Sequence, residues 1–455
     1  MELLNTCVHD INRYLWGVFF LIPLLCGTGI FYTIRLRFVQ VRYFGWAARY
    51  LFGGASLFGK KADQSGMSSF QALATAVAAQ VGTGNVAGTA TAIVSGGPGA
   101  LFWLWLAAFF GMATIFAEAV LALTFRTRDA SGHIVGGPAY YITLGMGKKY
   151  RFLSYFFAVA IIIALGCIGN MVQSNSISLA MQSAFDIPLW VSGVATAVLA
   201  GSVFFGGIGR LASVTEKLVP LMAATYLIGG SFVILSHWDQ ILPAFELIFT
   251  AAFNPQAVGG GALGFTVAKA MQFGVARGLF SNEAGMGSTP HAHAIAKVEH
   301  PAEQGLVAIF GVFATVLIVT FTGIVILVTG VLDYQSTGIE LTQRAYDVGL
   351  GDYGRAFVAI CLFFFAYSTI IGWYFFGSQN VRFLFGPKGL FPYRLIVCLF
   401  IGFGAVLKVD LVWALADLFN GLMVIPNLIA LLCLHKVVVR CLEDFEQKLQ
   451  QQPGK

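Results

Sequence analysis

The sequence carries little charge for its length. Of its 455 residues, 11% are Asp, Glu, Lys or Arg and 58% are hydrophobic. Because soluble globular proteins carry about 25% charged residues, this composition indicates a polytopic membrane protein. The formal net charge of +6 does not indicate a nucleic-acid partner, since the basic residues gather in the loops between apolar segments.

Patterns that form disulfides or metal sites are also scarce. None of the seven cysteines forms a C-x-x-C pair, and most of them lie in apolar segments, so we expect neither a disulfide framework nor a zinc site. His291, His293 and His300 with Glu299 lack the spacing of a closed zinc site, and we expect them to hold no metal. No nucleophile–base pair occurs in the apolar segments, so we expect a protein that is not an enzyme and has no cofactor.

Long apolar runs are abundant instead, and each is about long enough to span a bilayer as a helix of roughly 20 residues. They predict an all-α protein with eleven transmembrane helices, the first retained rather than cleaved as a signal peptide. The expected spans are 14–34, 68–95, 100–125, 152–185, 188–207, 214–236, 263–288, 304–330, 354–385, 391–407 and 411–434.

Arginine and aromatic residues alternate between the first two spans, over residues 35–61. This pattern is typical of an amphipathic segment on the cytoplasmic membrane surface. A basic loop that only sets the topology is the alternative.

The distribution of basic residues predicts the orientation of the chain. If the N-terminus lies outside, most of the 27 lysines and arginines fall in inner loops and the tail. Only Arg13, Arg344, Arg355 and Lys408 fall in outer loops. Cytoplasmic loops are enriched in Lys and Arg, so we expect the N-terminus outside and the C-terminus in the cytoplasm of a bacterial or archaeal type inner membrane.

Two of the spans are interrupted by glycine and polar residues, VGTGN at 81–85 and GLFSNEAGMGS at 278–288. Each glycine costs a helix about 1 kcal/mol relative to alanine, and unwound backbone in lipid leaves polar groups unsatisfied. A glycine-rich face for close helix packing is the plain alternative for the first interruption alone. Matched interruptions in two halves, however, are typical of the central binding site of a transporter.

The interruptions divide the chain into repeats once the first span is set aside. Ten spans remain, five and five, and each set begins with an interrupted span. An odd number of spans gives the second set the opposite polarity, which predicts an inverted repeat. The expected domains are an N-terminal span with the amphipathic segment (1–67), a first repeat (68–236), a second repeat (237–434) and a cytoplasmic tail (435–455).

Three long motifs resemble the alanine or glycine:cation symporter family, also described as sodium:alanine symporter-like. They are VGTGNVAGTATAIVSGGPGALFWLWLAAFFGMATIFAE, GGPAYYITLGMG and RGLFSNEAGMGSTPHAHAIAKVEHPAEQGLVAIFGVF. The family is related to leucine-transporter-fold amino-acid carriers with two inverted five-helix repeats. The resemblance implies uptake of alanine or glycine driven by sodium, or less often by protons, by alternating access.

A zwitterionic substrate needs donors for its carboxylate and acceptors for its ammonium group. Backbone N–H groups of Gly82, Thr83 and Gly84 begin the half-helix after the first break, where the helix end is electropositive, and we expect them to bind the carboxylate. Asn85 offers a side-chain carbonyl to an ion or to the ammonium group, or it caps the half-helix.

Further substrate contacts are expected on two other spans. Asn170 and Gln173 share a polar face with Gly166 and Ser174; Gln173 is favoured as a contact with Asn170 behind it, helix–helix hydrogen bonds being the alternative. The resemblance implies that freed carbonyls near Ser281 and Asn282 hold the ammonium group and that Phe280 shapes the pocket. Trp373 either lids a small pocket or belongs to the core.

A sodium site is implied by the resembling fold, in which a hydroxyl pair meets carbonyls just before the first break. Here that pair is Ser368 and Thr369, and the carbonyls are those of Ala78 and Val81. Hydrogen bonding of the two hydroxyls to their own helix is the alternative.

Two departures from the family pattern bear on the ion. Ile115 stands where the family often has Lys, three residues before Glu118, and Thr315 stands where it usually has Asp. The intramembrane charges Glu118, Lys269, Arg277 and Glu283 could form a neutral network.

Other functions remain as alternatives. A glutamine or other polar amino-acid symporter could use the same scaffold, and so could a proton-coupled carrier. A channel is disfavoured, because one asymmetric site within one bundle differs from a symmetric pore.

Overall fold

The computed structural model describes residues 2–17, 20–53, 66–254, 266–407 and 409–451. Almost all of the regular structure in these ranges is helical, as the sequence predicts. The N-terminal part forms α1 (Glu2–Leu15), α2 (Leu21–Arg35), α3 (Val39–Arg42) and α4 (Phe44–Phe52). The expected amphipathic segment therefore contains helix, but its residues 54–61 lie outside the described ranges, as do residues 263–265 of the seventh expected span.

The next part of the chain, up to Ser236, contains the first interruption and a short hairpin whose strands pair antiparallel. Its elements are α5 (Ser69–Gln80), η1 (Gly84–Gly88), α6 (Thr89–Gly96), α7 (Ala100–Thr124), β1 (Thr127–Arg128), β2 (Ile134–Val135), α8 (Pro138–Tyr141), η2 (Ile142–Met146), η3 (Lys148–Tyr150), α9 (Arg151–Ile161), η4 (Ile162–Gly169), α10 (Asn170–Phe185), α11 (Leu189–Phe204) and α12 (Gly207–Ser236).

The remaining part contains the second interruption, between α15 and α16. Its elements are η5 (Trp238–Gln240), α13 (Ile241–Phe253), α15 (Val267–Asn282), α16 (Pro290–His293), α17 (Pro301–Val328), α18 (Gly338–Leu350), η6 (Gly351–Tyr353), α19 (Gly354–Phe385), η7 (Pro387–Gly389), α20 (Leu390–Gly404), α21 (Val409–Cys433) and α22 (His435–Gln451).

Six helical stretches among the described residues are long and apolar enough to cross a membrane. They are Ala100–Thr124, Lys148–Phe185, Gly207–Ser236, Pro301–Val328, Gly338–Phe385 and Val412–Cys433, and Leu21–Arg35 and Leu189–Phe204 are shorter apolar helices. Each of the expected spans contains helix, so the all-α polytopic class is confirmed. The number of eleven spans stays a prediction.

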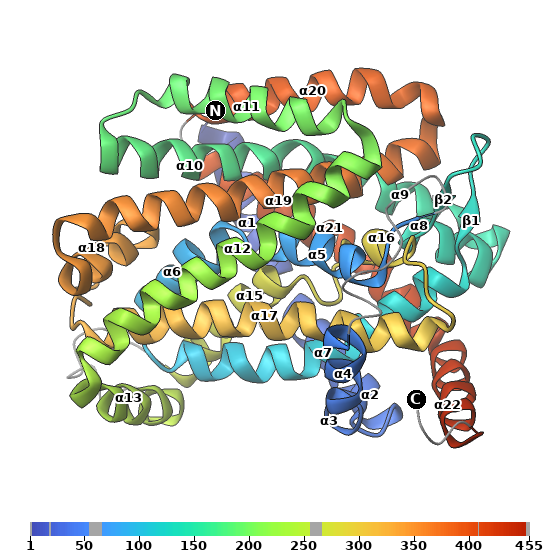
Figure 1. Cartoon of the computed structure of the whole chain (residues 1–455), viewed down its shortest axis with the longest axis horizontal. Helices are drawn as coiled ribbons and strands as arrows, with labels where there is room; N and C mark the ends of the chain where they lie inside the picture. Colours follow the sequence, from blue (N-terminus) through green and yellow to red (C-terminus); the bar gives the residue numbers. More distant parts are fainter. Residues whose placement is uncertain (1, 18–19, 54–65, 255–265, 408, 452–455) are drawn as a thin grey trace.

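The interrupted helices occupy the middle of the bundle. In Figure 1, α5, α6 and α15 lie between α10, α11 and α20 on one side and α7 and α17 on the other. The most extensive contacts join α7 with α17, α7 with α15, and α10 with α19. The β1–β2 hairpin and α22 lie at one end of the bundle, and α13 and α18 lie at the other.

Candidate functional site

The first interruption releases backbone carbonyls in the centre of the bundle. Ser68 and Gln71 form a capping box that fixes the start of α5, and the helix ends at Gln80, after which Val81 has φ −94° and ψ 87°. The last four carbonyls of a helix lack partners within it. The chain resumes as the π-helix η1, a form that occurs often at functional sites.

Two hydroxyl groups of α19 meet these carbonyls. Ser368 Oγ lies 3.1 Å from the Ala78 oxygen, and Thr369 Oγ1 lies 3.1 Å from the Ala78 oxygen and 3.3 Å from the Val81 oxygen. Both hydroxyls also reach the Phe365 carbonyl of their own helix, at 2.8 and 3.1 Å. The structure therefore brings together all four residues expected at the sodium site, and it also contains the alternative hydrogen bonds.

Gly82 is required by this close approach. A Cβ atom on Gly82 would lie 2.4 Å from Thr369 Oγ1 and 3.2 Å from Gln173 Oε1. Both distances are shorter than ordinary contacts, and the residue lies in the break itself. Any larger residue at position 82 would therefore force the Thr369 side chain to shift.

The amides expected to bind a carboxylate already contact side-chain oxygens. The Gly82 N–H donates to Asn85 Oδ1 at 2.9 Å, and the Thr83 N–H donates to Gln173 Oε1 at 3.3 Å. Gln173 on α10 therefore reaches the first break, and Asn85 Oδ1 binds an amide of the break itself, while η1 has no side-chain cap. Both amides therefore have side-chain acceptors, which a bound oxygen anion would have to replace.

The second interruption lies against the first. Helix α15 ends at Asn282, and Glu283 follows with a left-handed φ of 55°. Asn85 Nδ2 donates to Ser281 Oγ at 2.7 Å, and Gln80 Nε2 donates to the Asn282 carbonyl at 2.6 Å. The two breaks, about 200 residues apart in sequence, thus form one continuous polar centre.

Gln80 was not expected at the site. It is buried, and its Oε1 atom has no hydrogen-bond partner among the described residues. An amide at the last residue before the VGTGN interruption could have indicated this role. Thr322 was also missed; its hydroxyl donates to the Asn85 carbonyl at 3.0 Å, and the sequence offers no signal for that contact.

Two aromatic side chains pack on glycines beside the breaks. A Cβ atom on Gly84 would lie 3.3 Å from the Phe280 ring, and one on Gly169 would lie 2.7 Å from the Trp373 ring. Trp373 Nε1 donates to Glu283 Oε1 at 2.6 Å, and Ser288 Oγ donates to Glu283 Oε2 at 2.5 Å. Trp373 therefore joins α19 to the turn after the second break.

Two residues of the expected polar face, Asn170 and Ser174, make hydrogen bonds within the bundle. Asn170 Nδ2 donates to the Gly166 carbonyl at 3.0 Å within its own helical segment. Ser174 Oγ donates to the Ile401 carbonyl of α20 at 2.7 Å. The alternative of hydrogen bonding within and between helices holds for these two residues, whereas Gln173 reaches the break.

The suggested network of four intramembrane charges is wrong. Glu118 accepts hydrogen bonds from the N–H groups of Gly285 and Gly287 and from Asn427 Nδ2. Arg277 lies 4.0 Å from Asp417. Lys269 is exposed. Glu118 therefore accepts hydrogen bonds from neutral donors of the loop after the second break and of α21. The sequence does not reveal this arrangement.

The histidines after the second break serve structural contacts. His291 contacts the Ser288 carbonyl and Asn380, and His293 contacts Gln304. His300 caps α17 and contacts Asp444 at 3.0 Å. Across the described ranges, no three His, Cys, Asp or Glu side chains gather as a metal site.

The chain is similar to known proteins over nearly its full length. The model of the sodium:alanine symporter family matches residues 1–455. The sodium/alanine symporter AgcS of Methanococcus maripaludis is 42% identical over 447 residues, covering 97% of each chain. The probable sodium/glutamine symporter GlnT of Bacillus subtilis is 42% identical over 450 residues, covering 98% of this chain and 92% of that protein.

The fold is also similar to that of a solved transporter. A manganese transporter from Eremococcus coleocola superposes with a TM-score of 0.53 at 15% identity, covering 78% of this chain and 74% of that one. At this identity the likeness concerns the fold alone. It agrees with an all-α polytopic fold.

Proposed function

This chain belongs to the sodium:alanine symporter family, and from that premise we propose that it takes up alanine or glycine together with sodium. Membership of the family makes it an integral membrane amino-acid:cation symporter rather than an enzyme. The coupling ion and the substrate are the proposed part. Transport of sodium with an amino acid requires one site for an alkali ion and one for a zwitterion. The residues around the two breaks are candidates for both sites.

The observation that carries the proposal is the oxygen cluster between α5 and α19. Thr369 Oγ1 lies within 3.3 Å of four main-chain carbonyl oxygens, those of Ala78, Ala79 and Val81 at the first break and that of Phe365 in its own helix. One hydroxyl proton can satisfy only one of them. Ser368 adds a second hydroxyl 3.1 Å from the Ala78 oxygen. A neutral cluster of hard oxygen atoms suits a cation that prefers oxygen ligands.

The substrate is proposed to lie beside this cluster. Its carboxylate would accept from the amides of Gly82, Thr83 and Gly84, with Asn85 and Gln173 turning aside to contact the ligand. Its ammonium group would contact oxygens around Ser281 and Asn282. Phe280 and Trp373 would enclose a small side chain, with Asn170 supporting Gln173 from behind.

The helix contacts support the proposed inverted repeat. In the expected order of spans, α7 and α17 are second in their sets, α10 and α19 are third, and α11 and α20 are fourth. Each of these equivalent pairs is in extensive contact, as expected around a pseudo-twofold axis. We extend the proposal to eleven spans, to the domains 1–67, 68–236, 237–434 and 435–455, and to an outside N-terminus with a cytoplasmic C-terminus.

Counterflow of labelled alanine in proteoliposomes tests the function. We expect alanine or glycine trapped inside to drive uptake of labelled alanine, and uptake to depend on external sodium. Replacing sodium with potassium should abolish this, and a pH gradient alone should not restore it. If a proton gradient drives uptake equally in the absence of sodium, the sodium assignment is wrong.

Glutamine is the second candidate, because one relative is a probable sodium/glutamine symporter at 42% identity. The close packing of Trp373 on Gly169 favours a smaller side chain. Competition decides between them: excess unlabelled glutamine should leave alanine uptake nearly unchanged. If glutamine competes better than alanine or glycine, the proposed small pocket is incorrect.

A further inference from the structure

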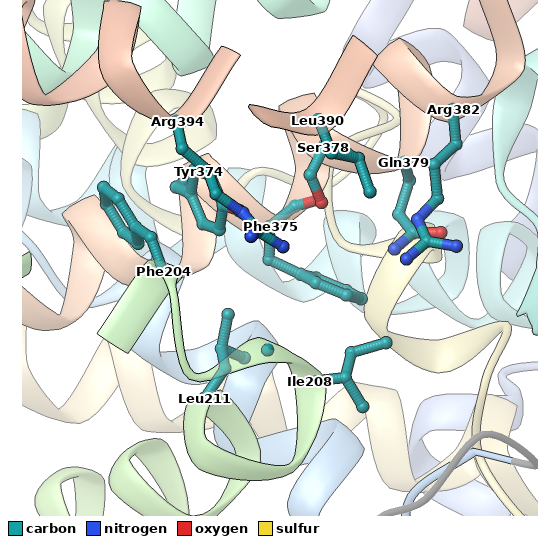
Figure 2. Close-up of a pocket in the computed structure, with 11 residues that line it drawn as sticks. Phe204, Ile208, Leu211, Tyr374, Phe375, Ser378, Gln379, Arg382, Leu390 and Arg394 are labelled. Atoms are coloured by element: carbon teal, nitrogen blue, oxygen red, sulfur yellow. The ribbon is translucent and has the colours of Figure 1, made fainter. Parts of the chain in front are cut away.

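A cavity lies where the turn between α11 and α12 packs against α19 and α20. It is separate from the two breaks and is drawn in Figure 2. Phe204, Ile208 and Leu211 line one side, while Tyr374 and Gln379 line another. We propose that this cavity binds a phosphate group, supplied by the headgroup of a membrane phospholipid. The proposal goes beyond transport and does not depend on which amino acid is carried.

Two arginines line the cavity, and one of them lacks a carboxylate partner among the described residues. Arg382 pairs with Asp129 at 2.5 Å. Arg394 pairs with no carboxylate among the described residues: its Nε donates to Tyr374 Oη at 3.2 Å, and its guanidinium lies 5.6 Å from the Phe205 ring centre. Figure 2 shows the Arg394 side chain directed into the cavity. Its two terminal nitrogens can bind phosphate oxygens bidentately, as arginine commonly does.

A buried amide provides an independent indication of a ligand. Gln379 is 2% exposed and lines the cavity, and its Oε1 atom has no hydrogen-bond partner among the described residues. Buried polar groups without partners are costly. Figure 2 draws the nitrogen of this amide on the side of the cavity, where it can donate to a phosphate oxygen.

The neighbouring hydroxyls add one more donor. Tyr374 accepts from Arg394 through its oxygen, which leaves its own O–H proton to donate. Ser378 already donates to the Phe375 carbonyl at 2.7 Å and supplies no donor. The groups that converge on the cavity are thus arginine, amide and phenol donors, a set that fits an anion.

The size of the cavity excludes the transported substrate. Its volume is about 40 Å³, and roughly 10–15 Å³ holds one water-sized group. A phosphate group with its oxygens therefore fits, whereas a whole amino acid does not. Phe205 and Phe391, 48% and 60% exposed, lie with ring centres 6.3 Å apart near Arg394. This apolar rim suits acyl chains, and basic pockets between membrane helices bind anionic headgroups.

The test measures thermal stabilisation of the full-length protein in detergent. Dioleoylphosphatidylglycerol should raise the Tm. Dioleoylglycerol has the same acyl chains but no phosphate and should not raise the Tm. Inorganic phosphate alone should not raise it either. Arg394→Gln and Gln379→Leu should each weaken the apparent affinity for the phospholipid by about tenfold, the loss of one or two charge-assisted hydrogen bonds. Arg440→Gln, an exposed arginine on α22, is the charge-matched control.

Three results would overturn the proposal. Equal stabilisation by dioleoylglycerol would mean that only apolar contacts matter, and equal stabilisation by inorganic phosphate would exclude a lipid source. An equal loss of phospholipid affinity in Arg440→Gln would indicate that the surface charge as a whole, and not this cavity, attracts the lipid. If Arg394→Gln does not fold, Arg394→Lys keeps the charge without the bidentate fork. That variant should bind the phospholipid with reduced affinity, and unchanged affinity would count against the site.

Discussion

At the scale of single residues, the site depends on small and neutral groups placed where the helices are interrupted. Gly82 allows Thr369 to approach the first break, and Gly169 allows Trp373 to pack against η4. Asn85 joins the breaks through Ser281. None of these contacts requires a formal charge. If the proposed cation binds here, its release would leave no carboxylate of these contacts unpaired.

Removing the two hydroxyls of α19 should weaken the cation site. In Ser368→Ala with Thr369→Val, we expect the sodium concentration for half-maximal alanine uptake to rise by about thirtyfold, because two hydrogen-bonding groups at about 1 kcal/mol each are lost. Ser192→Ala with Thr196→Val removes two buried hydroxyls from α11 and is the matched control. An unchanged sodium curve in the α19 variant would place the ion elsewhere.

Trp373 should determine which side chains are accepted. Its ring packs on Gly169, and its Nε1 atom donates to Glu283. Forcing a larger substrate against a rigid ring costs about 1–3 kcal/mol, so Trp373→Ala should weaken alanine uptake and let leucine or methionine compete. Trp373→Phe should retain exclusion of leucine while losing the hydrogen bond. A competition panel measures both effects.

Two results of that panel would oppose the small pocket. If the unsubstituted protein already accepts leucine as well as alanine, the pocket is not small. If Trp373→Ala loses alanine uptake without gaining any larger substrate, the indole belongs to the core rather than to a lid.

At the scale of elements, the interrupted spans and the hairpin perform different tasks. The breaks of α5–η1 and α15 expose backbone groups in the centre. At the end of the bundle that carries α22, the β1–β2 hairpin is tied to α19 by the ion pair of Asp129 and Arg382. This contact links the helix that carries Ser368 and Thr369 to a segment outside the membrane spans.

The ion pair of Asp129 with Arg382 should make the stability of the protein depend on pH in the acidic range. Partial burial raises the pKa of Asp129, but hydrogen bonds from the His133 N–H, Arg382 and the Ser131 N–H outweigh it and hold the pKa below its usual range. A carboxylate whose pKa is lowered in the folded state stabilises the fold at pH values above its unfolded-state pKa, which is about 3.9 for Asp. That stabilisation is lost as the pH falls through the lower, folded-state pKa.

Asp129→Asn should therefore lower the Tm of the protein in detergent at neutral pH, by an amount equivalent to roughly 1–3 kcal/mol. The difference from the unsubstituted protein should shrink toward pH 3. Asp352→Asn removes an exposed acid from η6 and should change little. A difference that is constant with pH would show that the carboxylate charge is not responsible.

At the scale of the whole molecule, the sequence predicts the class and the position of the centre better than the connections within it. Apolar runs and the two glycine-rich interruptions are local patterns, and they identify helices and breaks directly. The contacts of Gln80 with Asn282, of Thr322 with Asn85, and of Glu118 with the Gly285–Gly287 turn join residues about 170 to 240 positions apart. Such pairings depend on how the helices pack, which no local pattern contains.

The loop charges predict the orientation of the whole molecule, and two introduced cysteines can test this prediction. Asp352→Cys in η6 and Lys149→Cys in η3 lie in exposed turns. The elements on either side place these turns at opposite ends of the bundle (Figure 1). With the N-terminus outside, position 352 faces the exterior and position 149 faces the cytoplasm, because positive residues favour cytoplasmic loops.

In an otherwise cysteine-free protein, a membrane-impermeant maleimide added to intact cells should label the position 352 variant and not the position 149 variant. Permeabilised cells should show labelling of both, which controls for reactivity. The reverse pattern in intact cells would invert the proposed topology. It would also place the phosphate cavity, formed near the end of α19 that carries Arg382, in the opposite leaflet.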